Sequence, residues 1–156
     1  MTVELVRLDD RLVHGQVVVG WGQALAISLV VLVDDHVRES GWEQELYRMG
    51  MPPDMDLEFA SVAEGVSGME AWVHSRKKTL LLTGDVDSLV RLVEGAGIRH
   101  VTIGGVHQHT DRRQRLRYVY LSERESAQLR RLVDCGVEVS AQDVPTAKPI
   151  PWAEIP

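Results

Sequence analysis

The sequence has little cysteine and no long apolar run. A single cysteine, Cys135, among 156 residues excludes an internal disulfide framework and any paired-cysteine metal knuckle. No apolar stretch approaches the ~20 residues that a membrane-spanning helix needs. The N-terminal segment carries Glu4 where the core of a signal peptide would be apolar. These absences predict a protein that resides in the cytoplasm.

Positive charge is also scarce. The chain has 17 lysines and arginines against 23 aspartates and glutamates, a formal net charge of -6, which argues against non-specific binding of nucleic acid. A Gly-x-Gly-x-x-Gly motif between the first apolar run and the following segment is missing, so a dinucleotide-binding domain is not expected.

Short apolar runs alternate with helix-like segments along the chain. This alternation predicts an α/β fold, a three-layer doubly wound arrangement with a mainly parallel sheet and helices on both faces. We expect one domain over residues 1–156, with a proline-rich tail from about residue 145. The runs interpreted as strands are Val3–Leu8, Leu29–Val33, Leu57–Ala60, Leu80–Leu82, Val101–Ile103, Tyr118–Leu121 and Val137–Val139.

Sequence motifs mark the first residue of several predicted helices. "SVAE" at 61–64 and "SERE" at 122–125 fit the capping box, in which a serine and a glutamate satisfy each other's free amides. Asp85 is placed to cap a short helix through Val93, which Gly95 and Gly97 stop, and a weaker helix is expected over residues 36–49. The segment after His14 could form a strand or a helix. Its valines favour a strand, whereas the spacing of its apolar residues favours a helix.

The stretch "RLDDRLVHGQV" at 7–17 combines the residues best suited to chemistry. His14 would follow the first strand and begin the first helix, where free amides and the helix dipole bind anions. Arg11 adds donors that suit phosphate oxygens, and a neutral imidazole is a nucleophile near neutral pH. A carboxylate of the Asp9–Asp10 pair is expected to hold the other ring nitrogen; the pattern does not separate the two, and we assign Asp10 to the catalytic set. Phosphotransfer is one interpretation, beside a general base and a plain loop residue.

The same stretch resembles a known family. "RLDDRLVHGQVVVGW" and the following "VVLVDD" are similar to the opening of component IIB of the mannose/fructose/sorbose class of the bacterial phosphoenolpyruvate-dependent sugar phosphotransferase system. The similarity covers essentially the whole chain, because four later segments occur in family order. These are "LLTGDVDSLVRLVEGAGI", "VTIGGVH", "YVYLSERE" and "GVEVSAQDVPT".

The resemblance implies a function and its residues. His14 would accept a phosphoryl group from the phosphohistidine of component IIA and pass it to a sugar held by the membrane components IIC and IID, with Arg11 beside the phosphoryl group. Family analogy favours phosphorylation at Nδ1. The phosphate-binding groups that follow from the motif and from the loops after the first, fourth and fifth strands are Gly15, Gln16, Thr83, Gly104 and Gly105.

The resemblance also implies the surroundings of the protein. We expect peripheral association with the membrane transporter complex, no cofactor, no nucleic acid, and a homodimer as one possible assembly. Four arginines close together in the chain form a basic segment, which we favour as part of the docking face for component IIA. It consists of Arg112, Arg113, Arg115 and Arg117.

Two alternatives stay open at this stage. A regulatory phosphocarrier would use His14 in the same way without feeding a transporter. A metal site is the less favoured alternative, because His107 and His109 stand two residues apart and His14 is expected nearby, with a carboxylate to complete a zinc shell. The metal site is less favoured because the transfer of a phosphoryl group between histidines does not need a metal ion.

Overall fold

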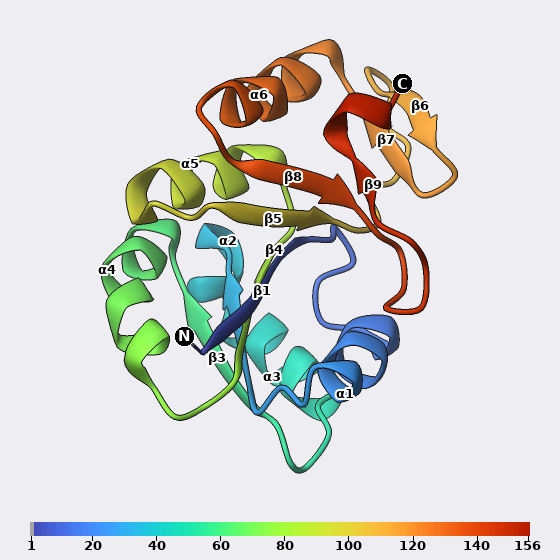
Figure 1. The fold of residues 1–156 in the computed structure, drawn as a ribbon. Helices are drawn as coiled ribbons and strands as arrows, with labels where there is room; N and C mark the ends of the chain where they lie inside the picture. The colour runs from blue at the N-terminus through green and yellow to red at the C-terminus, as the bar shows by residue number, and fades with distance from the viewer. Residues whose placement is uncertain (1) are drawn as a thin grey trace.

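The computed structural model describes residues 2–156 and contains a mainly parallel seven-stranded sheet, which confirms the predicted α/β fold (Figure 1). The strand order is β3-β2-β4-β1-β5-β8-β9, and only β9 runs antiparallel to its neighbour. The strands are β1 (Val3–Leu8), β2 (Leu29–Val33), β3 (Asp56–Ala60), β4 (Thr79–Thr83), β5 (His100–Ile103), β8 (Glu138–Ala141) and β9 (Ile150–Pro151).

Helices cover both faces of the sheet and enclose two apolar clusters. One cluster joins the sheet to α4, α5 and α6; the other joins it to η1, α2 and α3. All residues of β2 and β4 are buried, as expected for central parallel strands. The helices are η1 (Gln16–Trp21), α1 (Gly22–Ala24), α2 (Asp35–Arg38), α3 (Gly41–Met49), α4 (Val62–His74), α5 (Val86–Ala96), α6 (Glu123–Asp134) and the 3-10 turn η2 (Trp152–Glu154).

The predicted helix starts are confirmed where a cap defines them. Both capping boxes are present, with Ser61 and Ser122 each accepting a hydrogen bond from the amide of the glutamate three residues later. Asp85 caps α5 through its side chain, but the helix continues past the predicted end at Val93 to Ala96, and Gly97 ends it at φ +68°, a value that favours glycine. The segment after His14, for which the sequence did not decide between strand and helix, is helical, and this conformation buries Val17, Val18 and Trp21.

Three segments differ from the simplest expectation. Tyr118–Leu121 contains a strand, β7 (Val119–Leu121), but this strand pairs with β6 (Arg113–Leu116) in a separate antiparallel hairpin. The sequence gives no apolar signal for β6, because three of its four side chains are polar. The predicted helix at 36–49 is two helices, α2 and α3. The proline-rich tail is ordered as β9 and η2 at the edge of the sheet, where proline is tolerated.

Candidate functional site

The loop that follows β1 is held between its two neighbouring strands. The amide of Asp9 donates to the carbonyl of Thr83 at the end of β4, with N and O 2.9 Å apart. The amide of Asp10 donates to the carbonyl of Gly105, just after β5, also at 2.9 Å. The loops after the first and fifth strands therefore meet at the carboxyl edge of the sheet, where doubly wound proteins place their ligands.

Asp9 lies at the centre of a buried charge network. Its side chain is 0% exposed and accepts from Arg11 at both oxygens, with Nε–Oδ1 and Nη2–Oδ2 distances of 3.1 Å. Arg7, also 0% exposed, approaches Oδ2 with Nη2 at 3.4 Å. One carboxylate thus pairs with two guanidinium groups, an arrangement that offsets the cost of burying charge.

The charges around Asp9 keep it ionised. Burial by itself raises the pKa of Asp9, but the contacts with His14 and Arg11 and the charge of Arg7 outweigh burial and hold the pKa well below its usual range. The contact with Asp9 raises the pKa of Arg11, while burial lowers the pKa of Arg7. The network is therefore a fixed anion flanked by cations at neutral pH.

Arg7 is a site residue that the sequence analysis missed. Its Nη1 donates to the carbonyl of Gln142 at 2.8 Å and its Nη2 to that of Asp143 at 3.1 Å. The guanidinium lies over the ring of Trp21, 4.9 Å from Cζ to the ring centroid, and the indole N–H donates to the carbonyl of Asp143. The available signal was an arginine between Val6 and Leu8 in the apolar second half of the strand, because a buried cation at such a position needs a partner.

His14 lies at the start of η1 with its ring against the buried carboxylate. Nε2 is 3.4 Å from Oδ2 of Asp9, an electrostatic contact without the alignment of a full hydrogen bond. The side chain is 19% exposed, so one side of the imidazole is accessible. Gly15 and Gln16 are exposed at the beginning of the helix, where amides lack intrahelical partners.

Asp10 does not face the imidazole, which corrects its assignment as the carboxylate that orients His14. Its Oδ2 accepts from the amide of His107 at 2.7 Å, and its Oδ1 contacts Nδ1 of the same histidine. The chain turns directly after Asp9, where the amide of Leu12 donates to the carbonyl of Asp9, and only Asp9 of the pair contacts the ring. Asp9 takes that place, and Asp10 instead joins the loops after β1 and β5.

Two predicted phosphate-binding glycines have other roles, and a third predicted residue, Thr83, is buried. The amides of Gly104 and Gly105 donate to the carbonyl of Leu8 and to Oδ2 of Asp9, so neither is free for an anion. A side chain at Gly104 would collide with the guanidinium of Arg7; this glycine makes space for the buried cation. Thr83 is fully buried, and its hydroxyl is therefore not at the accessible face of His14.

The predicted basic docking segment is largely neutralised. Arg112 makes a two-point contact with Glu125, with both N–O distances 2.9 Å, and Arg115 and Arg117 pair with Glu123 and Asp143. Arg113 is exposed and makes no ion pair within residues 2–156. Arg112 also donates to the carbonyl of His107, so its role is to fasten this loop to α6.

Reversing the charge of Arg112 is expected to lower stability. Arg112→Glu places a carboxylate against Glu125 and removes three charge-assisted hydrogen bonds, so the free energy of unfolding should fall by about 2 kcal/mol or more. Arg113→Glu, at an exposed position, is the control and should stay within about 0.5 kcal/mol. Denaturant titration of both variants measures the difference. Equal stability of the two would contradict the fastening role.

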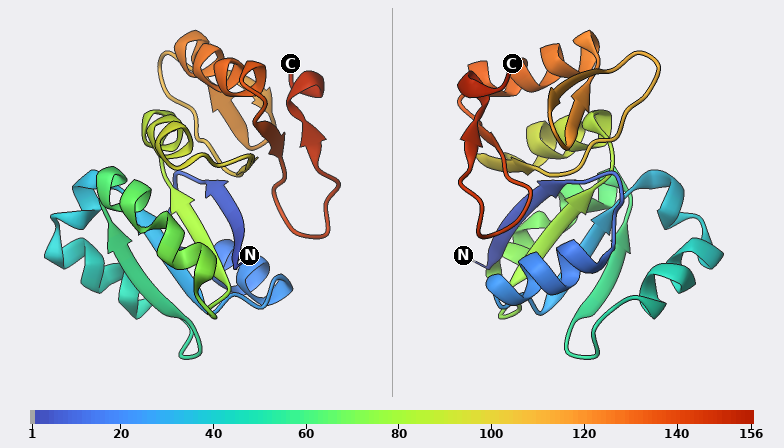
Figure 2. Two further views of the ribbon diagram at one scale, coloured as in Figure 1. Left: turned by 60° about the vertical axis from the view of Figure 1, so that its left-hand side comes forward. Right: turned by 90° about the vertical axis from the view of Figure 1, so that its right-hand side faces the viewer.

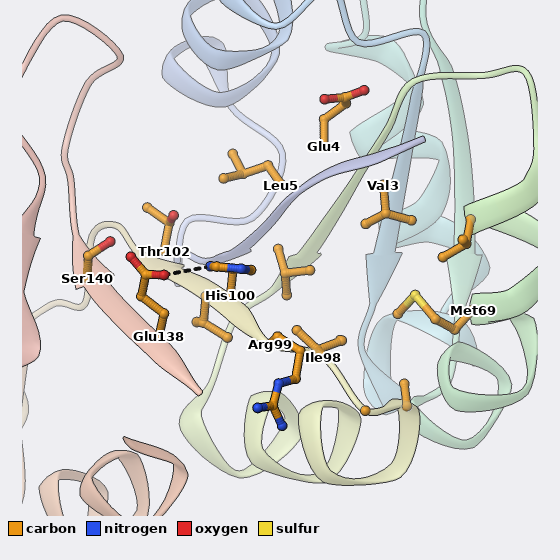
Figure 3. A pocket seen from close by; sticks show the side chains of 15 residues that line it. Val3, Glu4, Leu5, Met69, Ile98, Arg99, His100, Thr102, Glu138 and Ser140 are labelled. Carbon is orange, nitrogen blue, oxygen red and sulfur yellow. Dashed lines mark ion pairs between the residues drawn. The ribbon is translucent and has the colours of Figure 1, made fainter. Parts of the chain in front are cut away.

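A separate apolar pocket lies at the opposite, amino edge of the sheet (Figure 3). β1 and β5 pair only through Arg7–Thr102 and Leu8–Ile103, so the strands diverge toward their amino ends. Val3, Leu5, Met69 and Ile98 are among the lining residues, and an ion pair of His100 and Glu138 with a 3.0 Å separation lies on its rim. None of the predicted site residues lines this pocket.

Residues 2–156 contain no group of three or more histidine, cysteine, aspartate or glutamate side chains placed to hold a metal ion. In the same range, every helix is too short or too polar to cross a bilayer.

Fold and site together define a doubly wound α/β domain whose histidine, arginine and buried aspartate gather at the carboxyl edge of a parallel sheet. Residues 3–155 match the family described as "PTS system sorbose subfamily IIB component". The chain belongs to this family of sugar phosphotransferase system IIB components, which are phosphotransferases of bacterial sugar transport.

Individual relatives match over nearly their whole length. The N-acetylgalactosamine-specific phosphotransferase enzyme IIB component 1 of Escherichia coli K12 is 32% identical over 146 residues, 90% of each chain. The fructose-specific EIIB component of Bacillus subtilis is 25% identical over 147 residues, which cover 94% of this chain and 90% of that component. The solved structure of N-acetylgalactosamine-specific IIB component 1 from Escherichia coli aligns with a TM-score of 0.88 at 28% identity, covering 95% of this chain and 97% of that one.

Proposed function

We propose that His14 accepts a phosphoryl group from the phosphohistidine of a IIA protein and delivers it to a sugar bound by the membrane components IIC and IID. Family membership supports a phosphocarrier with these partners. The observation that carries the assignment to His14 is its position: an accessible imidazole at a helix N-terminus, backed by a buried carboxylate and flanked by a guanidinium.

The contact with Asp9 selects the nitrogen that reacts. An ionised carboxylate 3.4 Å from Nε2 favours the proton on that nitrogen. The lone pair is then on Nδ1, the ring nitrogen for which no contact with Asp9 is found. A phosphoryl group on Nε2 would meet the negative charge of Asp9, whereas one on Nδ1 avoids it. We therefore assign phosphorylation to Nδ1.

The transfer consists of two in-line displacements. In the first, the lone pair of Nδ1 forms a bond to phosphorus while the phosphorus–nitrogen bond of the donor phosphohistidine breaks. In the second, a hydroxyl oxygen of the sugar bonds to phosphorus, the hydroxyl proton is released and the bond to Nδ1 breaks. Positioning and charge stabilisation supply most of the catalysis of such steps.

Arg11 and the first amides of the helix are the groups that stabilise the transferred charge. Arg11 is held by Asp9 yet is one-third exposed, so its guanidinium borders the accessible side of the site. The exposed amides of Gly15 and Gln16 add donors at the positive end of the helix. Together these groups offset the negative charge that accumulates on the phosphoryl oxygens.

The proposal is tested by locating the phosphate. Purified protein is incubated with phosphoenolpyruvate, the general phosphotransferase proteins and a cognate IIA, and is mapped by mass spectrometry at mildly alkaline pH, where phosphohistidine survives. We expect one phosphate in the peptide that contains His14, and nitrogen-resolved NMR should place it on Nδ1. Phosphate on another residue would refute the acceptor, and phosphate on Nε2 would refute the role of Asp9.

Loss of the guanidinium at residue 11 is expected to slow the reaction without stopping it. Arg11→Ala should reduce the rate of phosphorylation by IIA by about a hundredfold, comparable to the loss of one donor that stabilises developing charge. Arg11→Lys keeps the charge but loses the two-point geometry, so its rate should lie between those of the parent and the alanine variant. Rapid-quench kinetics at saturating IIA measures the rates. Unchanged rates in both variants would exclude Arg11.

A further inference from the structure

The outer face of α3 exposes three large apolar side chains. Trp42, Leu46 and Met49 are 70%, 57% and 83% exposed. Their spacing of four and three residues places them on one side of the helix, and we call this face the α3 stripe. The same helix packs Tyr47 against the second apolar cluster, so the stripe points away from the core. α3 lies at the periphery of the molecule (Figure 2).

Such a grouping needs a physical explanation. Single exposed apolar side chains are common, but neighbouring ones of this size typically mark an interaction surface. Tryptophan is also among the residues that most often dominate binding energy when a partner covers them. The stripe therefore has the composition of a contact surface.

Acidic residues lie on α3 and on both sides of it in the chain. Glu45 is on the helix, Glu39 is two residues before it and Asp54 is five residues after it, and all three are exposed. The arginines on α2 and α3 are paired: Arg48 with Glu45, with its guanidinium also over the ring of Phe59, and Arg38 with Glu64. Glu39 and Asp54 make no ion pair within residues 2–156. These acidic residues repel an anionic lipid surface. They also disfavour a second copy, because a symmetric contact places like charges together, and three side chains cover less than the ~800 Å² per partner of a stable dimer.

We propose that the α3 stripe docks the protein on cytoplasmic loops of its membrane components, a partner with apolar side chains set among lysines and arginines. Membrane proteins concentrate these cations in their cytoplasmic loops, which complements the acidic residues on α3 and near it in the chain. The inference rests on the proposed function of His14. α3 follows the carboxyl end of β2, and His14 follows that of β1, so Trp42 lies toward the same edge of the sheet as the phosphorylated histidine.

Substitution of the stripe separates docking from phosphorylation. The double variant Trp42→Ser/Leu46→Ser should be phosphorylated by IIA at the parent rate. In membrane vesicles that contain the cognate IIC and IID, transfer from the phosphorylated variant to sugar should be at least about tenfold slower at low protein concentration. Met49→Gln should give a smaller loss in the same direction. Ala127→Ser, at an exposed position of α6 on the other face of the sheet, is the matched control and should transfer normally.

Several results would overturn the docking role. One is sugar phosphorylation at the parent rate by both stripe variants. Another is stripe-dependent binding to vesicles of anionic lipid without IIC and IID, which would identify a lipid surface. A third is self-association of the parent protein that the double variant loses, measured by sedimentation. Failure of the parent protein to be phosphorylated on His14 would instead refute the proposed function, so the two failures are distinct.

Discussion

His14→Ala is expected to fold and to take up no phosphoryl group at all. Under the proposed function, the substitution removes the atom that bonds to phosphorus, so the loss should be complete rather than graded. The ring is not part of either apolar cluster, and the buried pairs of Asp9 with Arg7 and Arg11 stay in place. Labelling from phosphoenolpyruvate through IIA measures the activity, and circular dichroism measures the fold.

His107→Ala is the matched control for this experiment. His107 lies in the loop after β5, is two-thirds exposed and contacts Asp10 rather than Asp9. We expect this variant to carry one phosphate, as the parent protein does. Full labelling of His14→Ala would show that another side chain is the acceptor and would end the assignment.

Asp9→Asn is expected to have the largest effect on stability. The change removes the anion that faces Arg7 and leaves a fully buried guanidinium without a charged partner. Breaking a buried ion pair on one side typically costs about 3–5 kcal/mol, and the free energy of unfolding should fall by a comparable amount. Urea titration followed by tryptophan fluorescence is a suitable measurement, because the ring of Trp21 lies against Arg7.

Asp10→Asn provides the comparison for the stability experiment. Asp10 is partly exposed and its partner His107 lies at the surface, so the loss should be below about 1 kcal/mol. If the two variants were equally stable, the buried network would not be the source of the effect. Asparagine at residue 9 should also slow phosphorylation, because the proton on Nε2 would lose its charged neighbour.

The stability difference between the parent and Asp9→Asn should depend on pH. Folding lowers the pKa of Asp9 below the value of about 3.9 for an unfolded aspartate. The carboxylate therefore contributes its full stabilisation above that value and loses it as the pH falls through the lower pKa of the folded state. We expect a constant difference near neutral pH and a shrinking one under acid conditions. A difference that grows on acidification would contradict the ionised state of Asp9.

The parts of the fold that the sequence predicts are those with local causes. The capping boxes at Ser61 and Ser122 satisfy amides within one turn, and the apolar runs of β2 and β4 require burial on both faces. Each signal is contained in a few neighbouring residues. The hairpin strand β6 has no such signal, because its pairing with β7 and the ion pairs of its arginines stabilise it.

The site was predictable in its exposed part and not in its buried part. His14 and Arg11 belong to a local motif, and the meeting of the loops after β1 and β5 follows from the strand order. The choice between Asp9 and Asp10 depends on which side of the chain faces the ring. The role of Arg7 depends on carbonyl groups 135 and 136 residues later, which no local pattern reveals.

Those two carbonyl groups connect the far end of the chain to its beginning. Gln142 and Asp143 directly follow β8, the last parallel strand, and their carbonyl groups accept from the guanidinium of Arg7 beside the loop that follows β1. A fragment that stops short of residue 142 keeps Asp9 as the charged partner of Arg7 but lacks both carbonyl acceptors of the guanidinium. The buried network beneath the loop that follows β1 can therefore be completed only after β8 and the residues that follow it are in place.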